Sequence, residues 1–191
     1  MQIKVADFNV EVVYSRRKTI GLTVFPDERV VLRLPYGGSV EDGRRFILEK
    51  QDWIRSKLRL AEENMEDAQD AGYLSEAAIR KLGEEAARDL KVRIDRFMPI
   101  VGVHVRHVTI RCQRTRWGSF SSAGNLNLNC LLMLTPPEVR DYVVVHELCH
   151  GLEMNHSSRF WQEVERVLPN YKTQVAWLKK NGPAIMARVP R

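Results

Sequence analysis

The chain contains few cysteines and no long apolar run. Its 191 residues include three cysteines, Cys112, Cys130 and Cys149, which are odd in number and lack CxxC spacing. This pattern excludes a disulfide framework and a cysteine-based zinc knuckle, so we expect small, buried, apolar thiols. No apolar stretch approaches the ~20 residues needed to cross a bilayer, and no signal peptide precedes the first strand pattern. We therefore expect a cytoplasmic protein without membrane contact.

Acidic residues are missing from two segments. The chain has 30 Lys and Arg against 24 Asp and Glu, a net charge of +6. Residues 96–137 hold five arginines and no acid, residues 166–191 hold six basic residues and no acid, and the segment between them has a net charge of −4. The overall usage, 44% hydrophobic and 28% charged, excludes a disordered or collagen-like chain. Basic charge clustered in this way indicates an anionic partner.

Short strands and capped helices are expected in the first half of the chain. Alternating apolar residues with turn signals predict an antiparallel β meander in residues 1–38. Ser39 and Ser75 can each cap a helix whose apolar residues recur every three or four positions. The second of these helices is expected to end at Pro99, because proline lacks the N–H that a continuing helix uses.

Strands followed by helices are expected in the second half. Alternation returns in residues 103–110 and 125–129, which predicts two strands. Thr135 can cap a long helix and form a capping box with Glu138. Taken together, the elements predict an α+β fold. Breaks are expected to divide the C-terminal part into short helices, at residues 155–157, 169–170 and 181–183.

A metal-ligand motif lies on the helix expected after Thr135. His146 and His150 are the outer residues of an HExxH sequence. Side chains four residues apart on a helix face the same way, so both imidazoles can bind one ion at Zn–N distances of about 2.0 to 2.1 Å. Glu147 lies about 100° round the helix, where its carboxylate can take a proton from a metal-activated water. These residues predict metal-dependent hydrolysis.

His156 is the predicted third ligand. It follows His150 by six residues, beyond a break in the helix that lets its side chain turn back toward the ion. Imidazole is also the commoner zinc ligand. A structural alternative remains, in which the histidines are buried and bonded to the backbone, with Glu147 paired beside them. The competing third ligands are the carboxylates of Glu153, three residues after His150, and of Glu163 and Glu165 on the next expected helix.

Two neighbouring segments bear on the substrate. Residues 125–129 form either an edge strand that holds an extended peptide, with Asn127 and Asn129 in contact with it, or an ordinary half-buried strand. The second segment contains arginines that suit bidentate phosphate or carboxylate binding and a tryptophan that can stack on a base; alternatively, the arginines are solvated or ion-paired and the tryptophan is part of the core. Its residues are Arg111, Arg114, Arg116 and Trp117.

Four motifs combine into a family resemblance. They are Arg116-Trp117-Gly118-Ser119 and residues 126–129, 141–150 and 155–161. Over nearly the whole chain, the sequence resembles the YgjP-like metallopeptidase family, a relative of the SprT-like and WLM metallopeptidases. The resemblance implies a compact zincin fold, with His146, His150 and His156 as zinc ligands and Glu147 as general base.

The same resemblance implies a domain organisation and shows one departure. We expect the β meander in residues 1–38, a zincin-like metallohydrolase domain in residues 39–182 packed with it as one unit, and a basic tail in residues 183–191. Where the family commonly has a cysteine after Trp-Gly-Ser, this chain has Phe120. Metal binding here therefore cannot depend on a thiol at that position.

Three functions are compatible with these features. The first is a zinc-dependent metallopeptidase acting on a peptide or protein, although another divalent ion can take the place of zinc. The second is a metal-dependent nucleoside triphosphate pyrophosphatase or phosphohydrolase that uses Arg111, Arg114 and Arg116. The third is a protein- or nucleic-acid-binding module with structural zinc, in which the basic C-terminal residues contact nucleic acid weakly.

Overall fold

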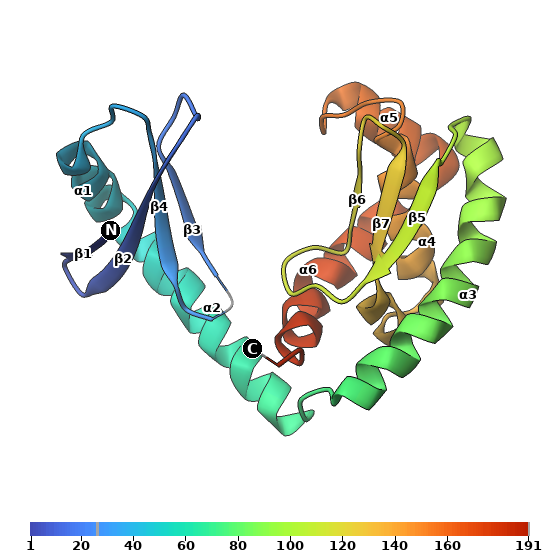
Figure 1. Cartoon of the computed structure of the whole chain (residues 1–191), viewed down its shortest axis with the longest axis horizontal. Helices are drawn as coiled ribbons and strands as arrows, with labels where there is room; N and C mark the ends of the chain where they lie inside the picture. The colour runs from blue at the N-terminus through green and yellow to red at the C-terminus, as the bar shows by residue number, and fades with distance from the viewer. Residues whose placement is uncertain (26, 191) are drawn as a thin grey trace. The chain divides into compact units, whose positions relative to one another are not determined.

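The computed structural model describes residues 1–25 and 27–190, without the side chains of residues 67 and 68 (Figure 1). The described residues form six α-helices, a 3-10 helix and two small sheets, which confirms the α+β class. They fall into two units, Met1–Asp70 and Ala71–Arg191, each with its own hydrophobic core. Among the helices described, none is long and apolar enough to cross a membrane.

The sheet of the first unit is mixed. Its strands are β1 (Gln2–Val5), β2 (Phe8–Ser15), β3 (Gly21–Val24) and β4 (Val30–Pro35), in the order β1-β2-β4-β3. Because β2 and β4 are parallel neighbours, the expected antiparallel meander is wrong in this one pairing. Alternation specifies which side chains face the core but not which strands pair. Strand β4 lies between β2 and β3, and its side chains that face the core, such as Leu32 and Leu34, are fully buried.

Two helices complete the core of the first unit. They are α1 (Val40–Glu49) and α2 (Gln51–Asp70). Ser39 caps α1 as predicted, because its Oγ accepts a hydrogen bond from the N–H of Glu41 at 3.1 Å. A Cβ added to Gly43 would lie 2.6 Å from Cδ2 of Leu32, so the absence of a side chain there lets α1 approach the sheet closely.

The second unit begins with α3 (Glu76–Val101). Ser75 caps it as predicted, since its Oγ accepts from the N–H of Ala78 at 3.2 Å. The expected end at Pro99 is wrong: the helix continues to Val101 and ends at Gly102, which has a φ of 84°. Gly102 N–H donates to the carbonyl of Met98, so a glycine in the left-handed region, rather than the proline, ends the helix.

The sheet of the second unit positions the functional residues. Its strands are β5 (His107–Arg111), β6 (Gly118–Phe120) and β7 (Asn125–Asn129), in the order β5-β7-β6. Since β7 is the central strand, parallel to β5 and antiparallel to β6, the edge-strand alternative for residues 125–129 is wrong. The buried leucines of β7 favour the central place, and β6 forms an edge instead.

Four helical segments follow β7: η1 (Cys130–Leu134), α4 (Pro137–Cys149), α5 (Ser158–Val167) and α6 (Tyr171–Ala187). The capping box predicted at Thr135 is wrong, because Thr135 Oγ1 donates instead to the carbonyl of Leu132 at 2.8 Å, and α4 begins at Pro137 without a side-chain cap. Cys130 and Cys149 are buried free thiols, as expected, and Cys112 is partly buried.

The helix stop predicted at residues 181–183 is also wrong. Helix α6 continues through Pro183 to Ala187. Gly182 packs against the indole of Trp117, where an added Cβ would lie 3.2 Å from Cζ2, so tertiary packing outweighs the weak helix propensity of Gly and Pro. Beyond the helix, Arg188 Nε donates to the carbonyl of Gly72 at 2.9 Å, which fixes this end of the chain to the segment before α3.

Candidate metal centre

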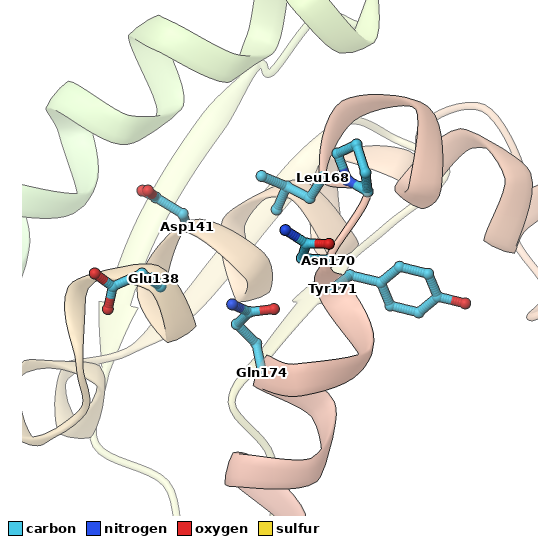
Figure 2. A pocket seen from close by; sticks show the side chains of 7 residues that line it. Glu138, Asp141, Leu168, Asn170, Tyr171 and Gln174 are labelled. Atoms are coloured by element: carbon cyan, nitrogen blue, oxygen red, sulfur yellow. The ribbon is translucent and has the colours of Figure 1, made fainter.

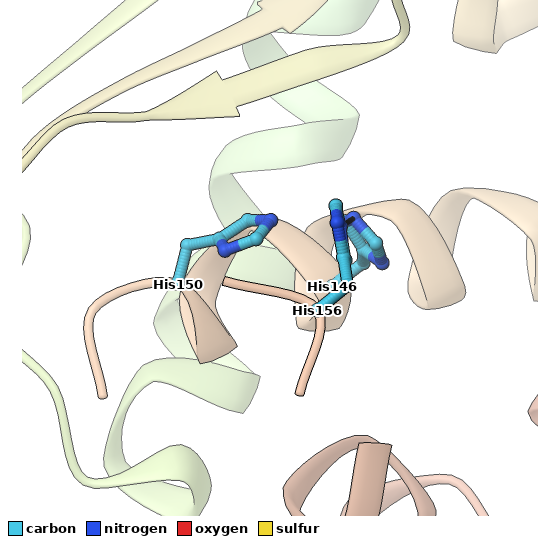
Figure 3. A group of neighbouring side chains, drawn as sticks. All are labelled: His146, His150 and His156. Atoms are coloured by element: carbon cyan, nitrogen blue, oxygen red, sulfur yellow. Dashed lines mark hydrogen bonds between the residues drawn. The ribbon is translucent and has the colours of Figure 1, made fainter. Parts of the chain in front are cut away.

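Three histidines meet at the C-terminal end of α4. His146 and His150 lie one turn apart on the helix, with ring centroids 5.1 Å apart, and His156 comes from the segment before α5 (Figure 3). Nε2 of His156 lies 3.1 Å from Nε2 of His146. One ring nitrogen from each of the three lies within 4.8 Å of the others. Among the side chains that the structure describes, this is the only group of three or more possible His, Cys, Asp or Glu ligands, so the competing carboxylates lie outside it.

Hydrogen bonds on the far side of two rings orient them. Nδ1 of His150 lies 3.1 Å from the backbone carbonyl of Glu153. A carbonyl only accepts, so this bond places the proton on Nδ1 and leaves the Nε2 lone pair for a metal. Nδ1 of His146 lies 3.2 Å from the hydroxyl of Tyr142, which can accept in the same way. Tyr142 was not foreseen, although its place one turn before His146 on α4 would have indicated it.

Aromatic side chains of α5 pack against the three histidines. Phe160 is fully buried, and its ring centroid lies 5.0, 4.5 and 4.8 Å from those of His146, His150 and His156. Trp161 stacks on His156 at 5.6 Å. Ser157 Oγ accepts from the N–H of Phe160 at 3.3 Å, so the cap of α5 sets where both aromatic residues lie. His156, although it lies outside the helices, thus packs against two aromatic rings of α5.

The electrostatics of the site favour neutral imidazoles. Burial, together with the smaller effect of the neighbouring His150 and His156, lowers the pKa of His146 to about 3. Burial also lowers the pKa of His150, against the hydrogen bond to Glu153. Metal ions bind the deprotonated ring. Three imidazoles with converging nitrogens fit a zinc ion of the catalytic kind, which takes three protein ligands and keeps a fourth position open.

Glu147 lies beside the edge strand β6. Its side chain is only 6% exposed, and a Cβ added to Gly118 would lie between 2.6 and 2.8 Å from its Cγ, Oε1 and Cδ atoms. Burial raises the pKa of Glu147 to about 7, although the positive charge of Arg116 opposes this rise. A carboxyl group that titrates near neutral pH can both accept and release a proton, as a general base requires.

Asn127 and Asn129, the predicted substrate contacts on β7, form hydrogen bonds within the protein. Asn129 is 1% exposed; its Nδ2 donates to the carbonyls of Gln113 and Arg116 at 2.7 and 2.8 Å, so its amide holds the loop before β6. Asn127 Nδ2 donates to Ser119 Oγ at 3.2 Å. Side chains alternate along a strand, so this pair faces away from the side on which Gly118 meets Glu147.

The remaining predicted contacts lie in and around the loop between β5 and β6. Trp117 is partly buried against the core and against Gly182, which favours the core alternative over base stacking. Arg116 is exposed, and its charge acts on Glu147. Arg114 is partly buried and Arg111 is exposed at the end of β5. Of the three arginines, only Arg116 thus acts electrostatically on the candidate base.

One hollow of the second unit lies apart from the histidines. It has a volume of about 190 Å³ and lies between the start of α4 and the joint of α5 and α6 (Figure 2). Asp141, one of its carboxylates, is bound by the guanidinium of Arg93, which Asp89 also holds. Neither Glu147 nor any of the three histidines lines the hollow, so we exclude it from the metal centre.

Comparison with known proteins decides the family. The sequence profile described as "YgjP-like, metallopeptidase domain" matches residues 18–86 and 64–181. The chain belongs to the YgjP-like metallopeptidase family. This YgjP-like chain is therefore a metal-dependent hydrolase. The match confirms the family resemblance, and it gives no support to the nucleotide or nucleic-acid alternatives.

Two solved structures are similar to this YgjP-like protein over about half its length. The metallopeptidase zymogen of Pyrococcus abyssi abylysin is 26% identical, with 48% of this chain and 93% of that chain covered, at a TM-score of 0.43. The metallopeptidase zymogen of Methanocaldococcus jannaschii jannalysin is 20% identical, with 49% and 94% covered, at a TM-score of 0.42. Comparison with curated proteins found no match.

Proposed function

We propose that this protein is a zinc-dependent metallopeptidase in which His146, His150 and His156 hold the metal and Glu147 is the general base. The observation that carries the proposal is the convergence of three imidazoles beside a buried carboxyl group. Zinc would serve better than a harder ion, because magnesium and calcium prefer oxygen ligands.

Glu147 moves the protons of the reaction. When bound, zinc lowers the pKa of a water and stabilises negative charge on the substrate carbonyl oxygen. Glu147 takes a proton from the attacking water, whose oxygen forms a bond to the carbonyl carbon. Glu147 then gives this proton to the amide nitrogen as the carbon–nitrogen bond breaks.

The open edge of β6 is the proposed seat of the peptide. Trp117 and Ser121 are hydrogen-bonded to β7, at 2.9 and 3.0 Å. In an antiparallel pair the residues alternate in direction, so the N–H and C=O groups of Gly118 and Phe120 point away from β7. An extended peptide can pair with them as an additional strand. The contact between Gly118 and Glu147 supports a cleaved bond close to the base.

A comparison of Glu147→Gln with wild type tests the proposal. The amide cannot act as a base, so we expect zinc content to be retained while cleavage of a peptide library falls by about 10² to 10⁴-fold. Glu138→Gln, the same change at an exposed position of α4, is the control and should cleave like wild type. Undiminished cleavage by zinc-loaded Glu147→Gln would overturn the role of Glu147, and cleavage without any metal would overturn the whole mechanism.

A further inference from the structure

A hollow of about 420 Å³ opens beside the metal centre. One wall is the metal-site residue His150 with the chain that follows it, and another comes from Phe120 of β6 and the turn to β7. The third wall is the segment between α3 and β5, which includes Val103. The hollow therefore adjoins both the candidate metal ligands and the strand proposed to hold the peptide.

Four large apolar side chains line this hollow, together with three glycines, two histidines and one serine. Leu152 and Met154, which follow α4, are 45% and 52% exposed although both are large and apolar. Exposed apolar side chains gathered around a concavity are typical of ligand sites. A Cβ added to Gly151 would lie 2.9 Å from Cγ1 of Val103, so the two walls approach each other closely. No Asp, Glu, Lys or Arg is among the lining residues.

The hollow lies about two residues along β6 from the point where this strand contacts the candidate base. Gly118 contacts Glu147, and Phe120 lies two residues further along β6. At about 3.3 Å per residue this is roughly 7 Å along the strand. Both residues direct their Cβ positions to the same face of the sheet, because side chains alternate. A peptide lying along β6 would thus carry a side chain over the hollow within two residues of the cleaved bond.

We propose that this hollow is a substrate subsite that binds an apolar side chain of the size of Leu, Met or Phe, and that Leu152 and Met154 determine this specificity. The inference rests on the proposed function and adds the class of peptide to it. A charged substrate side chain would lose water in the hollow and find no opposite charge there, which disfavours it.

Cleavage-site profiling of the full-length, zinc-loaded protein on a mixed peptide library tests the subsite. For wild type we expect Leu, Met and Phe to be enriched at one fixed position within two residues of the cleaved bond. Leu152→Glu and Met154→Glu should each reduce that enrichment about 10-fold and favour Lys or Arg at the same position. Val92→Glu is the matched control, because Val92 is 69% exposed on α3 outside the hollow, and its profile should equal that of wild type.

The possible results separate the two proposals. Cleavage by wild type without apolar enrichment, or enrichment that survives both substitutions, overturns the subsite and leaves the peptidase intact. If wild type cleaves no peptide, the proposed function fails and the subsite fails with it. Zinc content and circular dichroism of each variant show that it is folded; if one variant unfolds, the other decides, and the wild-type profile decides by itself if both do.

Discussion

The hydroxyl of Tyr142 is the polar contact behind His146. Burial raises the pKa of Tyr142 to about 12, so the hydroxyl keeps its proton and stays neutral beside the imidazole. The ring of Tyr142 stacks on Tyr171 at 6.3 Å, and Tyr171 stacks on Trp161 at 5.4 Å. Since Trp161 also stacks on His156, two of the candidate ligands are connected through aromatic side chains of three helices.

Removal of that hydroxyl should weaken metal binding. Tyr142→Phe keeps the aromatic stack but takes away the group 3.2 Å from Nδ1 of His146. We expect the affinity for zinc to fall about 10-fold, in line with the loss of other groups that orient a ligand. Competition with a chromophoric chelator measures it. Tyr171→Phe, which removes a hydroxyl that has no hydrogen bond in the described structure, should bind zinc like wild type; equal affinities for all three proteins would contradict the role of Tyr142.

Glu147 gives the metal-free protein a defined pH dependence. Its pKa is about 7 in the folded state against 4.5 in the unfolded chain, so between these values the folded state holds more protons. The free energy of unfolding contributed by this group therefore falls as pH rises from 4.5 to 7. Relative to Glu147→Gln, wild type should lose about 3 kcal/mol across this window.

Urea denaturation in the presence of a chelator at pH 4, 5, 6, 7 and 8 measures this difference. Wild type and Glu147→Gln should be close in stability at pH 4 and should diverge as the pH rises, with wild type the less stable protein. His146 titrates with its pKa shifted downward in both proteins, so its contribution cancels in the comparison. A difference that stays constant from pH 4 to 8 would contradict a raised pKa for Glu147.

At the level of elements, local signals predicted helix starts, and pairing and packing could not be predicted. Ser39 and Ser75 cap their helices through neighbouring N–H groups, which is a property of a few consecutive residues. Thr135 is buried, and its hydroxyl bonds the preceding turn, so tertiary structure replaced the expected cap. The order of β5, β6 and β7 depends on contacts between distant residues, and alternation alone does not contain it.

In the candidate site, too, local spacing could be predicted from the sequence and contacts between distant strands could not. The pattern of His146 and His150 on one helix face follows from helical spacing, and the structure brings His156 to them as the motif indicated. The assignment of Asn127 and Asn129 to the substrate depended on which strand lies at the edge. Because β6 is the edge strand, the residue that approaches Glu147 is Gly118, and a glycine has no side chain whose chemistry could have indicated it.

The close approach of β6 to α4 makes Gly118 sensitive to substitution. In Gly118→Ala, the new Cβ would lie 2.6 Å from Cγ of Glu147, so the strand or the carboxylate must move. A misplacement of about 1 Å at a catalytic group costs about 10²-fold in rate, so we expect a loss of that order in peptide cleavage with zinc content unchanged. Gly83→Ala on α3, where nothing lies within 4 Å, is the control, and it should keep full activity. Full activity of Gly118→Ala would show that this contact does not position the base.

On the scale of the whole molecule, the residues of the proposed chemistry all belong to one unit. The histidines, Glu147, β6 and the hollow lie within Ala71–Arg191, whose core is separate from that of Met1–Asp70. A fragment of residues 71–191 should therefore fold and bind one zinc ion with the affinity of the full chain. Thermal melting by circular dichroism and metal analysis measure this. A fragment that stays unfolded with zinc present would show that the first unit is needed for the fold of the second.

The contacts at the two ends of the second unit have a topological consequence. Leu74 N–H donates to the carbonyl of Arg188 at 2.8 Å, and Arg188 Nε reaches the carbonyl of Gly72. The first and last segments of the second unit are thus neighbours, so the backbone of this unit nearly closes on itself. Such a unit can be circularly permuted with a short linker, or inserted into a surface loop of another protein, without separating the elements that carry its chemistry.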